Sequence, residues 1–406
     1  MFPALCFLWR VAVRKPFRKI LSRIVAMFFA GLALACESPA RAEADDTTPL
    51  MLASAGGELK QVEELVASGA AVDQCDALGH TAIWHAVDAR KADVLAVLLK
   101  KAGTIQGQCP LGCGTIERAF QLDDWALIQP ILHASRNNPG WTGDARAELT
   151  KAIQRYASDH AKSITTSPWL GPKMEGSGHP LLAHAVLSGD MATTALLLDG
   201  GLDPNTRIGS PVDAELMDRV SPKLIRYYLK NDRGVSVLML AAGMENLAMV
   251  KLLLERGARE AACTYRYKMA AMSFAADLNN HDVMRALIGP CPQPSELRVE
   301  ISLSSQRATL FKNEKAVEST TISTGVKGKA TKPGDYLITN KEPLHISTIY
   351  KGAKMPFFMR LNCGDFGMHQ GVVTGSPASH GCVRLPAAIA RKWYSRVPAG
   401  TEVSIY

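Results

Sequence analysis

The segment PASHGCVRLP, residues 377–386, carries the strongest chemical signal in the chain. Its cysteine, Cys382, follows His380 closely and lies thirteen residues after His369. A thiolate attacks acyl carbons readily, but a free cysteine with a pKa near ~8.5 is mostly protonated at neutral pH. A neighbouring histidine supplies the base that such a nucleophile needs. Gly381 allows a tight turn before the cysteine, so backbone amides there are expected to face a developing oxyanion.

The sequence around this segment is typical of short strands. Residues 297–303 alternate between apolar and polar side chains, and a helix is expected over 387–394. Residues 341–354 are interpreted as a flexible flap over the cleft. Further strands are expected at 309–311, 316–323, 334–339, 357–361, 366–369 and 402–405. The pattern predicts a compact, mainly β domain over 296–406, which a proline-containing linker at 291–295 precedes.

In order and spacing, five motifs of this domain resemble the L,D-transpeptidase catalytic domain. They are STG at 323–325, PGDY at 333–336, MPFFMR at 355–360, GMH at 367–369 and SHGCVR at 379–384. The resemblance implies a β-sandwich-like fold and a cysteine thioester formed on the third residue of a peptidoglycan stem peptide. Terminal D-alanine leaves, and the acyl group passes to an amine.

The resemblance also assigns roles to residues. Cys382 is the expected nucleophile and His369 the general base. Arg384 is a candidate for binding a substrate carboxylate, with a solvated surface arginine as the alternative. Gln370 stands where glycine or serine is more usual, which leaves the group that orients the imidazole open; a backbone carbonyl could serve. The expected site-organising and oxyanion residues are Ser379, His380 and Gly381. No cofactor or metal is expected.

The region 43–290 repeats itself. TPLMLA at 48–53 is followed 33 residues later by TAIWHA at 81–86, and related units recur toward residue 288. The period and pattern resemble the ankyrin repeat. A helix pair cannot cover its own apolar face, so the repeats are expected to stack into an α-helical solenoid, with an insertion near 137–177. His85 and His184 are interpreted as packing or hydrogen-bonding residues.

Residues 1–42 have the pattern of a signal peptide, with basic residues, an apolar run and Ala-Arg-Ala at 40–42. We expect cleavage after Ala42, export to the periplasm or cell envelope, and no stable membrane span afterwards. An uncleaved anchor and lipidation at Cys36 are the alternatives. Without this segment the net charge of +8 falls to +2, since 39 basic and 37 acidic residues remain. The electrostatic argument for a nucleic-acid partner is then lost.

An exported protein can hold disulfides. We expect Cys75 to pair with Cys109 or Cys113, and Cys263 with Cys291. Cys109 and Cys113 lack the second ligand pair of a zinc module, so no metal site is predicted there.

Three functions are compatible with these patterns. The first is peptidoglycan transpeptidation in cell-wall biogenesis and cell-shape maintenance, with stem peptides as substrate and a protein partner bound through the ankyrin repeats. The second is hydrolysis by an L,D-carboxypeptidase, endopeptidase or amidase. The third is an ankyrin-based scaffold with a vestigial catalytic domain, in which Cys382 and His369 are structural. The acceptor amine, the protein partner and the oligomeric state stay open.

Overall fold

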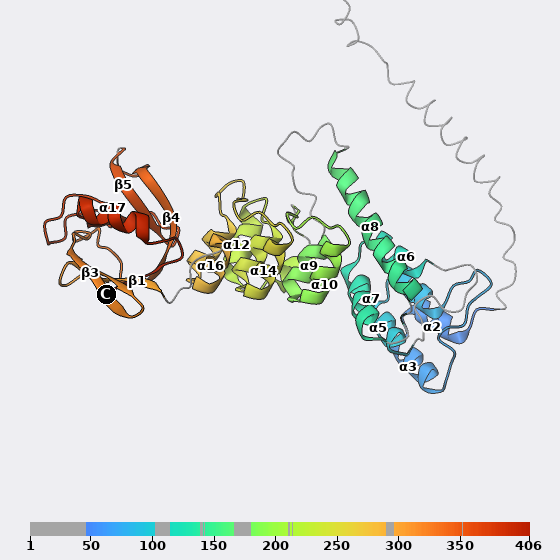
Figure 1. Cartoon of the computed structure of the whole chain (residues 1–406). Helices are drawn as coiled ribbons and strands as arrows, with labels where there is room; N and C mark the ends of the chain where they lie inside the picture. The colour runs from blue at the N-terminus through green and yellow to red at the C-terminus, as the bar shows by residue number, and fades with distance from the viewer. Residues whose placement is uncertain are drawn as a thin grey trace, which may run out of the picture.

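The computed structural model describes residues 46–101, 114–138, 141, 143–165, 180–209, 212, 214–289, 296–350 and 352–406. A row of helices leads into a sheet domain, as Figure 1 shows. The predicted signal peptide, the predicted linker at 291–295, Cys109, Cys113 and Cys291 lie outside these residues. The predicted order of a helical solenoid followed by a mainly β domain is confirmed.

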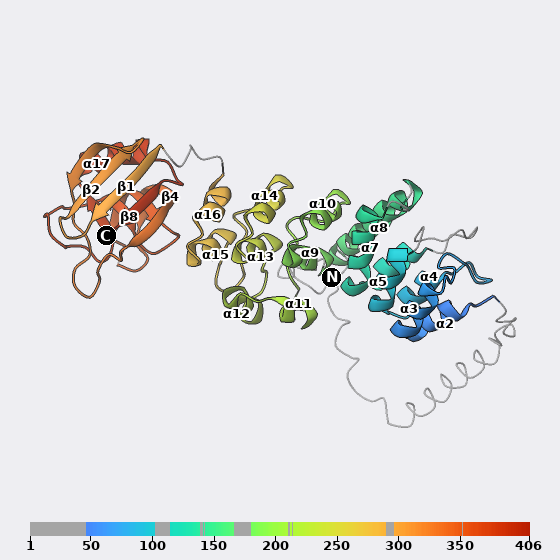
Figure 2. The same ribbon diagram turned by 90° about the horizontal axis from the view of Figure 1, so that it is seen from below.

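The helical region consists of short helices arranged in pairs, which stand side by side in Figure 2. Its described helices are α2 (Pro49–Gly56), α3 (Leu59–Ala67), α4 (Ala82–Asp88), α5 (Ala92–Lys101), α6 (Thr115–Gln121), α7 (Trp125–Asn137), α8 (Gly143–Thr165), α9 (Pro180–Ser188), α10 (Met191–Asp199), α11 (Ala214–Arg219), α12 (Lys223–Asn231), α13 (Val237–Gly243), α14 (Leu247–Glu255), α15 (Ala271–Asp277) and α16 (His281–Ile288). We call this region the array.

The repeated Thr and Ser positions of the array are helix N-caps. Thr48 accepts a hydrogen bond from the Met51 amide at 3.2 Å, and Ser236 does the same for Met239 at 3.2 Å. A hydroxyl at this position satisfies an amide that has no partner within the helix. The 33-residue spacing of TPLMLA and TAIWHA therefore marks where equivalent helices begin.

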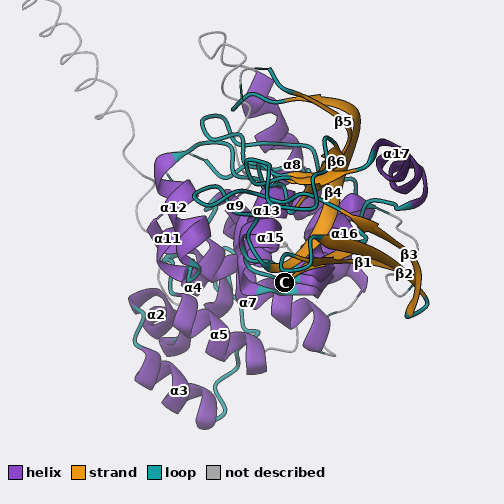
Figure 3. Ribbon diagram, turned by 90° about the vertical axis from the view of Figure 1, so that its left-hand side faces the viewer, coloured by secondary structure: helices purple, strands orange, loops and turns teal. Residues whose placement is uncertain are grey.

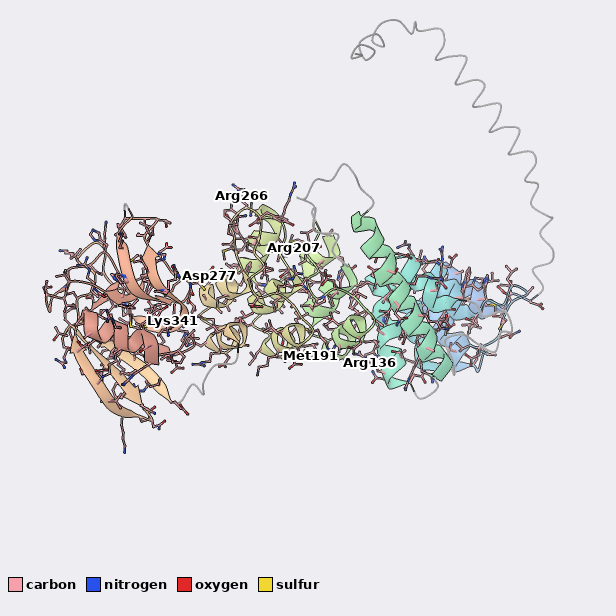
Figure 4. The ribbon with its side chains drawn as sticks, turned by 45° about the horizontal axis from the view of Figure 1, so that its top comes forward. Arg136, Met191, Arg207, Arg266, Asp277 and Lys341 are labelled. Carbon is pink, nitrogen blue, oxygen red and sulfur yellow. The ribbon has the colours of Figure 1, made fainter. Side chains whose placement is uncertain are left out.

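One apolar core runs through the array, because each helix pair buries a face against its neighbours. The described half of the predicted insertion contributes to this core. It forms the helix α8, in which Ile153 is fully buried. Beyond it, Arg136 at the end of α7 donates two hydrogen bonds to Asp190, at 3.0 and 2.8 Å. Asp190 also caps α10, so this ion pair joins the two halves of the array; Figure 4 shows Arg136 beside Met191.

The sheet domain contains eight strands in the order β3-β2-β1-β8-β4-β5-β6-β7. They are β1 (Leu297–Ser302), β2 (Arg307–Lys312), β3 (Lys315–Thr321), β4 (Gly334–Ile346), β5 (Lys354–Leu361), β6 (Gly367–Gln370), β7 (Val383–Leu385) and β8 (Glu402–Ile405). The pairs β1–β8 and β6–β7 are parallel and the others antiparallel. Figure 3 shows the sheet bending between β1 and β5, with α17 (Ala387–Arg396) on the inner side of the bend, between β5 and β3.

The long strand β4 belongs to both halves of this sheet. Its first residues pair with β8 and its later residues with β5, with a register shift between Ile338 and Asn340. Residues 341–346, which were expected to be part of a flexible flap, form the later part of β4 and pair with β5 at every position except Pro343. Among the described residues of the hairpin tip, 348–350 and 352 form turns.

The array packs against the sheet domain through α16 and β4. Leu337 in β4 is fully buried and joins the apolar core of the array. Arg285 forms an ion pair with Glu402, and Asn362 donates a hydrogen bond to Asn279 at 2.8 Å. Figure 4 shows Asp277 and Lys341 on the two sides of this junction. Among the described helices, none has the length and apolar character to cross a membrane.

Candidate active site

Parallel pairing of β6 with β7 brings His369 next to the segment that holds Cys382. In this register Met368 lies opposite Val383, and His369 opposite Arg384. Met368 and Val383 are fully buried in the sheet core. Side chains alternate between the two faces of a strand, so His369 and Arg384 occupy the opposite face. Cys382 precedes Val383 and shares that face.

A contact with β6 fixes the Cys382 sulfur in place. The backbone amide of Gly367, two residues before His369, forms a hydrogen bond with the thiol. Cys382 therefore lies beside Gly367, two residues along the chain from His369. Cys382 is a free thiol, which excludes a disulfide role for it.

The ring of His369 is oriented by the backbone. Its Nδ1 donates to the Gln370 carbonyl oxygen at 2.7 Å. A carbonyl only accepts, so the proton sits on Nδ1 and Nε2 keeps its lone pair. This contact answers the question that Gln370 raised in the sequence, since its carbonyl and not its side chain holds the imidazole. His369 therefore presents a basic nitrogen on the same face as the thiol.

Both groups are neutral in the resting site. Burial lowers the pKa of His369 to about 4, although the Gln370 carbonyl partly opposes this shift; the nearby Arg384 and His345 lower it further. Burial also raises the pKa of the Cys382 thiol above its ordinary value, against the Gly367 amide and the positive charge of Arg384. Removal of a charged group from water disfavours its charged form, which explains both directions. A preformed thiolate–imidazolium pair is thus not the resting state.

Ser379 organises the turn that precedes the thiol. Its side chain is almost fully buried, donates to the Cys382 carbonyl and accepts from the Gly381 amide at 3.1 Å. Gly381 has a φ of 121°, which a residue with a side chain would adopt only with strain. The Gly381 amide, which was expected at an oxyanion, is used here to shape the turn.

Thr331 supports the same turn from a distant loop. Its hydroxyl donates to the Gly381 carbonyl at 2.8 Å and accepts from the Gly325 amide at 2.9 Å. A Cβ on Gly325 would lie 2.1 Å from the Lys329 carbonyl oxygen, so only glycine fits there. No local pattern predicts this role of Thr331, because it depends on a contact across 50 residues.

His380 lies apart from the His369 and Cys382 face. It is exposed, and its carbonyl accepts from the Tyr350 hydroxyl at 3.3 Å. The two rings are 4.9 Å apart, and the Lys329 ammonium lies 4.9 Å from the Tyr350 ring centre. His380 thus contacts the tip of the β4–β5 hairpin.

Arg384 is positioned to meet an anion. Its backbone is tied to Ser323 by two hydrogen bonds, at 2.9 and 3.2 Å. Its aliphatic stem packs on Gly371, where a Cβ would come within 2.8 Å of it. Within the described part of the chain, no carboxylate forms an ion pair with its guanidinium. A free cation on the same face as the thiol suits a carboxylate ligand.

Three further polar residues, Glu342, His345 and Arg360, border the site. The sequence did not predict that they would contact one another. Glu342 contacts the His345 ring nitrogen at 2.8 Å and the Arg360 guanidinium at 3.3 Å. The His345 ring stacks on Phe358, with ring centres 4.6 Å apart. Strands β4 and β5 bring these residues together, and no local sequence pattern predicts which residues will pair across the hairpin.

Comparison with family models supports both regions. Residues 296–405 match the model described as the L,D-transpeptidase catalytic domain. Residues 23–108 match a model of three ankyrin repeats, and 233–265 match a single ankyrin repeat. The two resemblances seen in the sequence are thereby confirmed. No curated protein matches the chain.

Several solved structures resemble part of the chain. An L,D-transpeptidase from Mycobacterium smegmatis is 20% identical, and the match covers 27% of this chain and 58% of that one, with a TM-score of 0.26. One from Stackebrandtia nassauensis is 21% identical over 41% and 89% of the chains, with a TM-score of 0.27. The catalytic domain of an E. faecium L,D-transpeptidase is 22% identical over 28% and 100%, with a TM-score of 0.25. The chain thus spans little more than half of the M. smegmatis structure.

Proposed function

We propose that residues 296–406 form a cysteine-dependent L,D-transpeptidase that acts on peptidoglycan stem peptides. The observation that supports this proposal is the β6–β7 register, in which His369 pairs beside the segment that follows Cys382, in a domain that matches this family. A nucleophile beside an oriented base is what acyl transfer requires.

In the proposed reaction, Cys382 attacks the carbonyl carbon of the third stem residue while its proton passes to Nε2 of His369. The C–N bond to D-alanine then breaks, and the imidazolium returns the proton to the leaving amine. Because the thiol and the imidazole are both neutral at rest, proton transfer accompanies the attack. An acceptor amine next attacks the thioester, gives its proton to His369, and restores the thiol.

Arg384 is proposed to bind the carboxylate of the leaving D-alanine or of the diamino acid side chain. Its lack of an acidic partner in the described residues, and its place opposite His369 in the register, support this role. A bound carboxylate there would hold the scissile carbonyl near the thiol.

The location and the protein partner are proposals of the same kind. A peptidoglycan substrate requires export, for which the pattern of residues 1–42 is suited. Stacked repeats present an extended surface, so the array is proposed to bind a protein of the cell envelope. Fractionation of cells that express the full chain would test the location.

Products formed from disaccharide-tetrapeptides test the reaction. The purified full chain is incubated with them and analysed by mass spectrometry. Crosslinked dimers with loss of D-alanine are expected. Loss of D-alanine without dimers would replace transfer by hydrolysis, and the absence of both products and of any acyl adduct on Cys382 would overturn the enzymatic proposal.

A further inference from the structure

A second group of reactive side chains lies in the array, far along the chain from the thiol. Asp76 and His80 belong to the loop between α3 and α4, and His85 lies within α4. One donor atom from each of the three lies within 4.8 Å of the other two. The carboxylate is deeply buried, with 9% of the side chain exposed, while each imidazole is 22% exposed.

The two oxygens of the Asp76 carboxylate have different partners. Oδ1 accepts the backbone amides of Leu78 at 2.9 Å and His80 at 2.8 Å. Oδ2 instead faces two imidazoles, with Nε2 of His85 at 2.9 Å and Nδ1 of His80 at 3.8 Å. The first distance is a hydrogen bond and the second is too long for one. Within the described residues, the His80 ring makes no hydrogen bond.

The two rings are held in fixed orientations. His80 stacks on Trp84 with ring centres 3.6 Å apart and planes 5° apart. The His80 and His85 rings stand perpendicular, with centres 6.0 Å apart. Since Cys75 beside this loop is disulfide-bonded, the loop has a covalent anchor as well.

The cysteines predicted to pair with Cys75 lie outside the described residues, whereas Cys263 is a free thiol, so its predicted pairing with Cys291 is wrong.

We propose that Asp76, His80 and His85 bind a divalent zinc ion through Oδ2, Nδ1 and Nε2, with water in the fourth position. Zinc bonds to these atoms of about 2.0–2.1 Å, in a tetrahedron, require donors about 3.3–3.4 Å apart. The separations of 2.9 and 3.8 Å from Oδ2 bracket this value, and the two ring nitrogens lie within 4.8 Å of each other. Two imidazole donors disfavour calcium and magnesium, which take oxygen ligands.

The three side chains offer one carboxylate oxygen and two ring nitrogens, which are donor types that zinc takes. Nε2 of His85 donates to Oδ2 of Asp76, because a carboxylate only accepts. A zinc ion would take the place of that proton, which would leave to solvent.

Such a site would join the loop to α4. His85 does not occupy the histidine position of the ankyrin helix start, which Trp84 takes in TAIWHA, so the repeat itself does not require this contact. A bound ion stabilises the folded state by mass action, by about 2.7 kcal/mol at a free concentration 100 times the dissociation constant.

The test compares zinc binding by the untagged full chain and by His80→Ala, both treated with chelator and titrated with zinc chloride. His80 donates no side-chain hydrogen bond, so the variant is expected to fold. Wild type should bind one more zinc equivalent than the variant and gain thermal stability that the variant does not. Free thiols at Cys263, Cys363 and Cys382 are present in both proteins, so the difference isolates the loop site.

Two more variants test the role of the charge and control for a histidine outside the site. Asp76→Asn preserves a side-chain oxygen for the backbone amides but removes the charge, and should weaken binding at least tenfold. His281→Ala removes a half-buried array histidine outside the site and should bind zinc as wild type does. Equal zinc stoichiometry in wild type and His80→Ala, or no binding at micromolar zinc, would overturn the proposal.

Discussion

The array and the sheet domain obtain their order from contacts of very different range. In the array, Ser236 caps α13 by accepting a hydrogen bond from the Met239 amide three residues later, and α13 packs against neighbouring helices of the array. In the sheet domain, β1 pairs with β8 from the other end of the domain, with Val299 opposite Val403. Local changes should therefore act locally in the array, whereas a single change in the sheet domain can reach the candidate site.

The two regions also use histidine differently. His369 is held by a backbone carbonyl, which leaves its Nε2 unprotonated, while His85 faces a carboxylate and a second imidazole. A carbonyl partner fixes one tautomer of a neutral base, and a shared carboxylate creates a set of ligands for a cation. The partner, and not the histidine itself, decides the chemistry.

The largest expected effect comes from Cys382→Ala. Turnover of stem peptides should fall roughly 10⁴-fold or more, because the covalent intermediate cannot form. The free energy of unfolding should change by less than about 1 kcal/mol, since the side chain shrinks by one atom on a partly open face. Turnover by the variant at even a hundredth of the wild-type rate would remove Cys382 from the mechanism.

The sequence predicted what depends on local patterns. The Thr and Ser caps, the paired array helices and α17 follow from helix periodicity and capping, and the nucleophile motif was recognisable as a contiguous string. The strand β7 was missed, because three residues beginning inside that motif carry no strand signal of their own. Its pairing with β6 is nevertheless what unites His369 and Cys382.

What the sequence did not predict is set by pairing over long distances. Thr331, Glu342 and Arg360 reach the site only after strands and loops far apart in the chain have met. Long-range pairing also explains the predicted flap. The strand was expected to end at residue 339, but β4 continues to residue 346 because it pairs with β5 there. Cross-strand partners depend on register, which a single strand does not encode.

A pH titration should separate the buried base from ordinary histidines. The pKa of His369 is about 4 in the folded state and near ~6.5 in the unfolded state. Between pH 4 and pH 6.5, the imidazole is therefore protonated in the unfolded chain but neutral in the folded chain. Stability should fall as the pH drops from about 6.5 to 4, by about 3 kcal/mol from this group. The acid limb of kcat/KM should lie near pH 4 for the same reason.

His369→Gln is the matched variant for this titration, measured by denaturant unfolding at pH 7 and pH 4.5. It should lose part of the acid destabilisation, and His281→Gln in the array serves as a control substitution outside the sheet domain. An acid limb near pH 6.5 in wild type would show that the folded imidazole is solvated and would contradict the burial argument.

Thr331→Val should have a smaller, more selective effect. Loss of the hydroxyl removes the link between the Gly325 amide and the Gly381 carbonyl, so the turn before Cys382 loosens. We expect kcat/KM to fall roughly 10- to 100-fold through misplacement of the thiol. Ser236→Ala is the counterpart in the array and should cost about 1 kcal/mol of stability with unchanged kcat/KM. Equal kcat/KM for both variants would contradict the expectation that a change in the sheet domain reaches the candidate site while a change in the array does not.

The smallest expected effect is that of Arg136→Met, which removes the bidentate ion pair across the insertion. Arg136 and Asp190 are 25% and 29% exposed, so we expect a loss of about 1 kcal/mol, with turnover unchanged. Arg136 holds the pKa of Asp190 well below its usual range, so this contribution is complete above about pH 4 and is lost as the pH falls further. Arg256→Met breaks the more exposed pair with Asp199 and should cost less than about 0.5 kcal/mol. A larger loss for Arg256→Met than for Arg136→Met, measured by denaturant unfolding, would mean that the insertion does not depend on this ion pair to join the halves of the array.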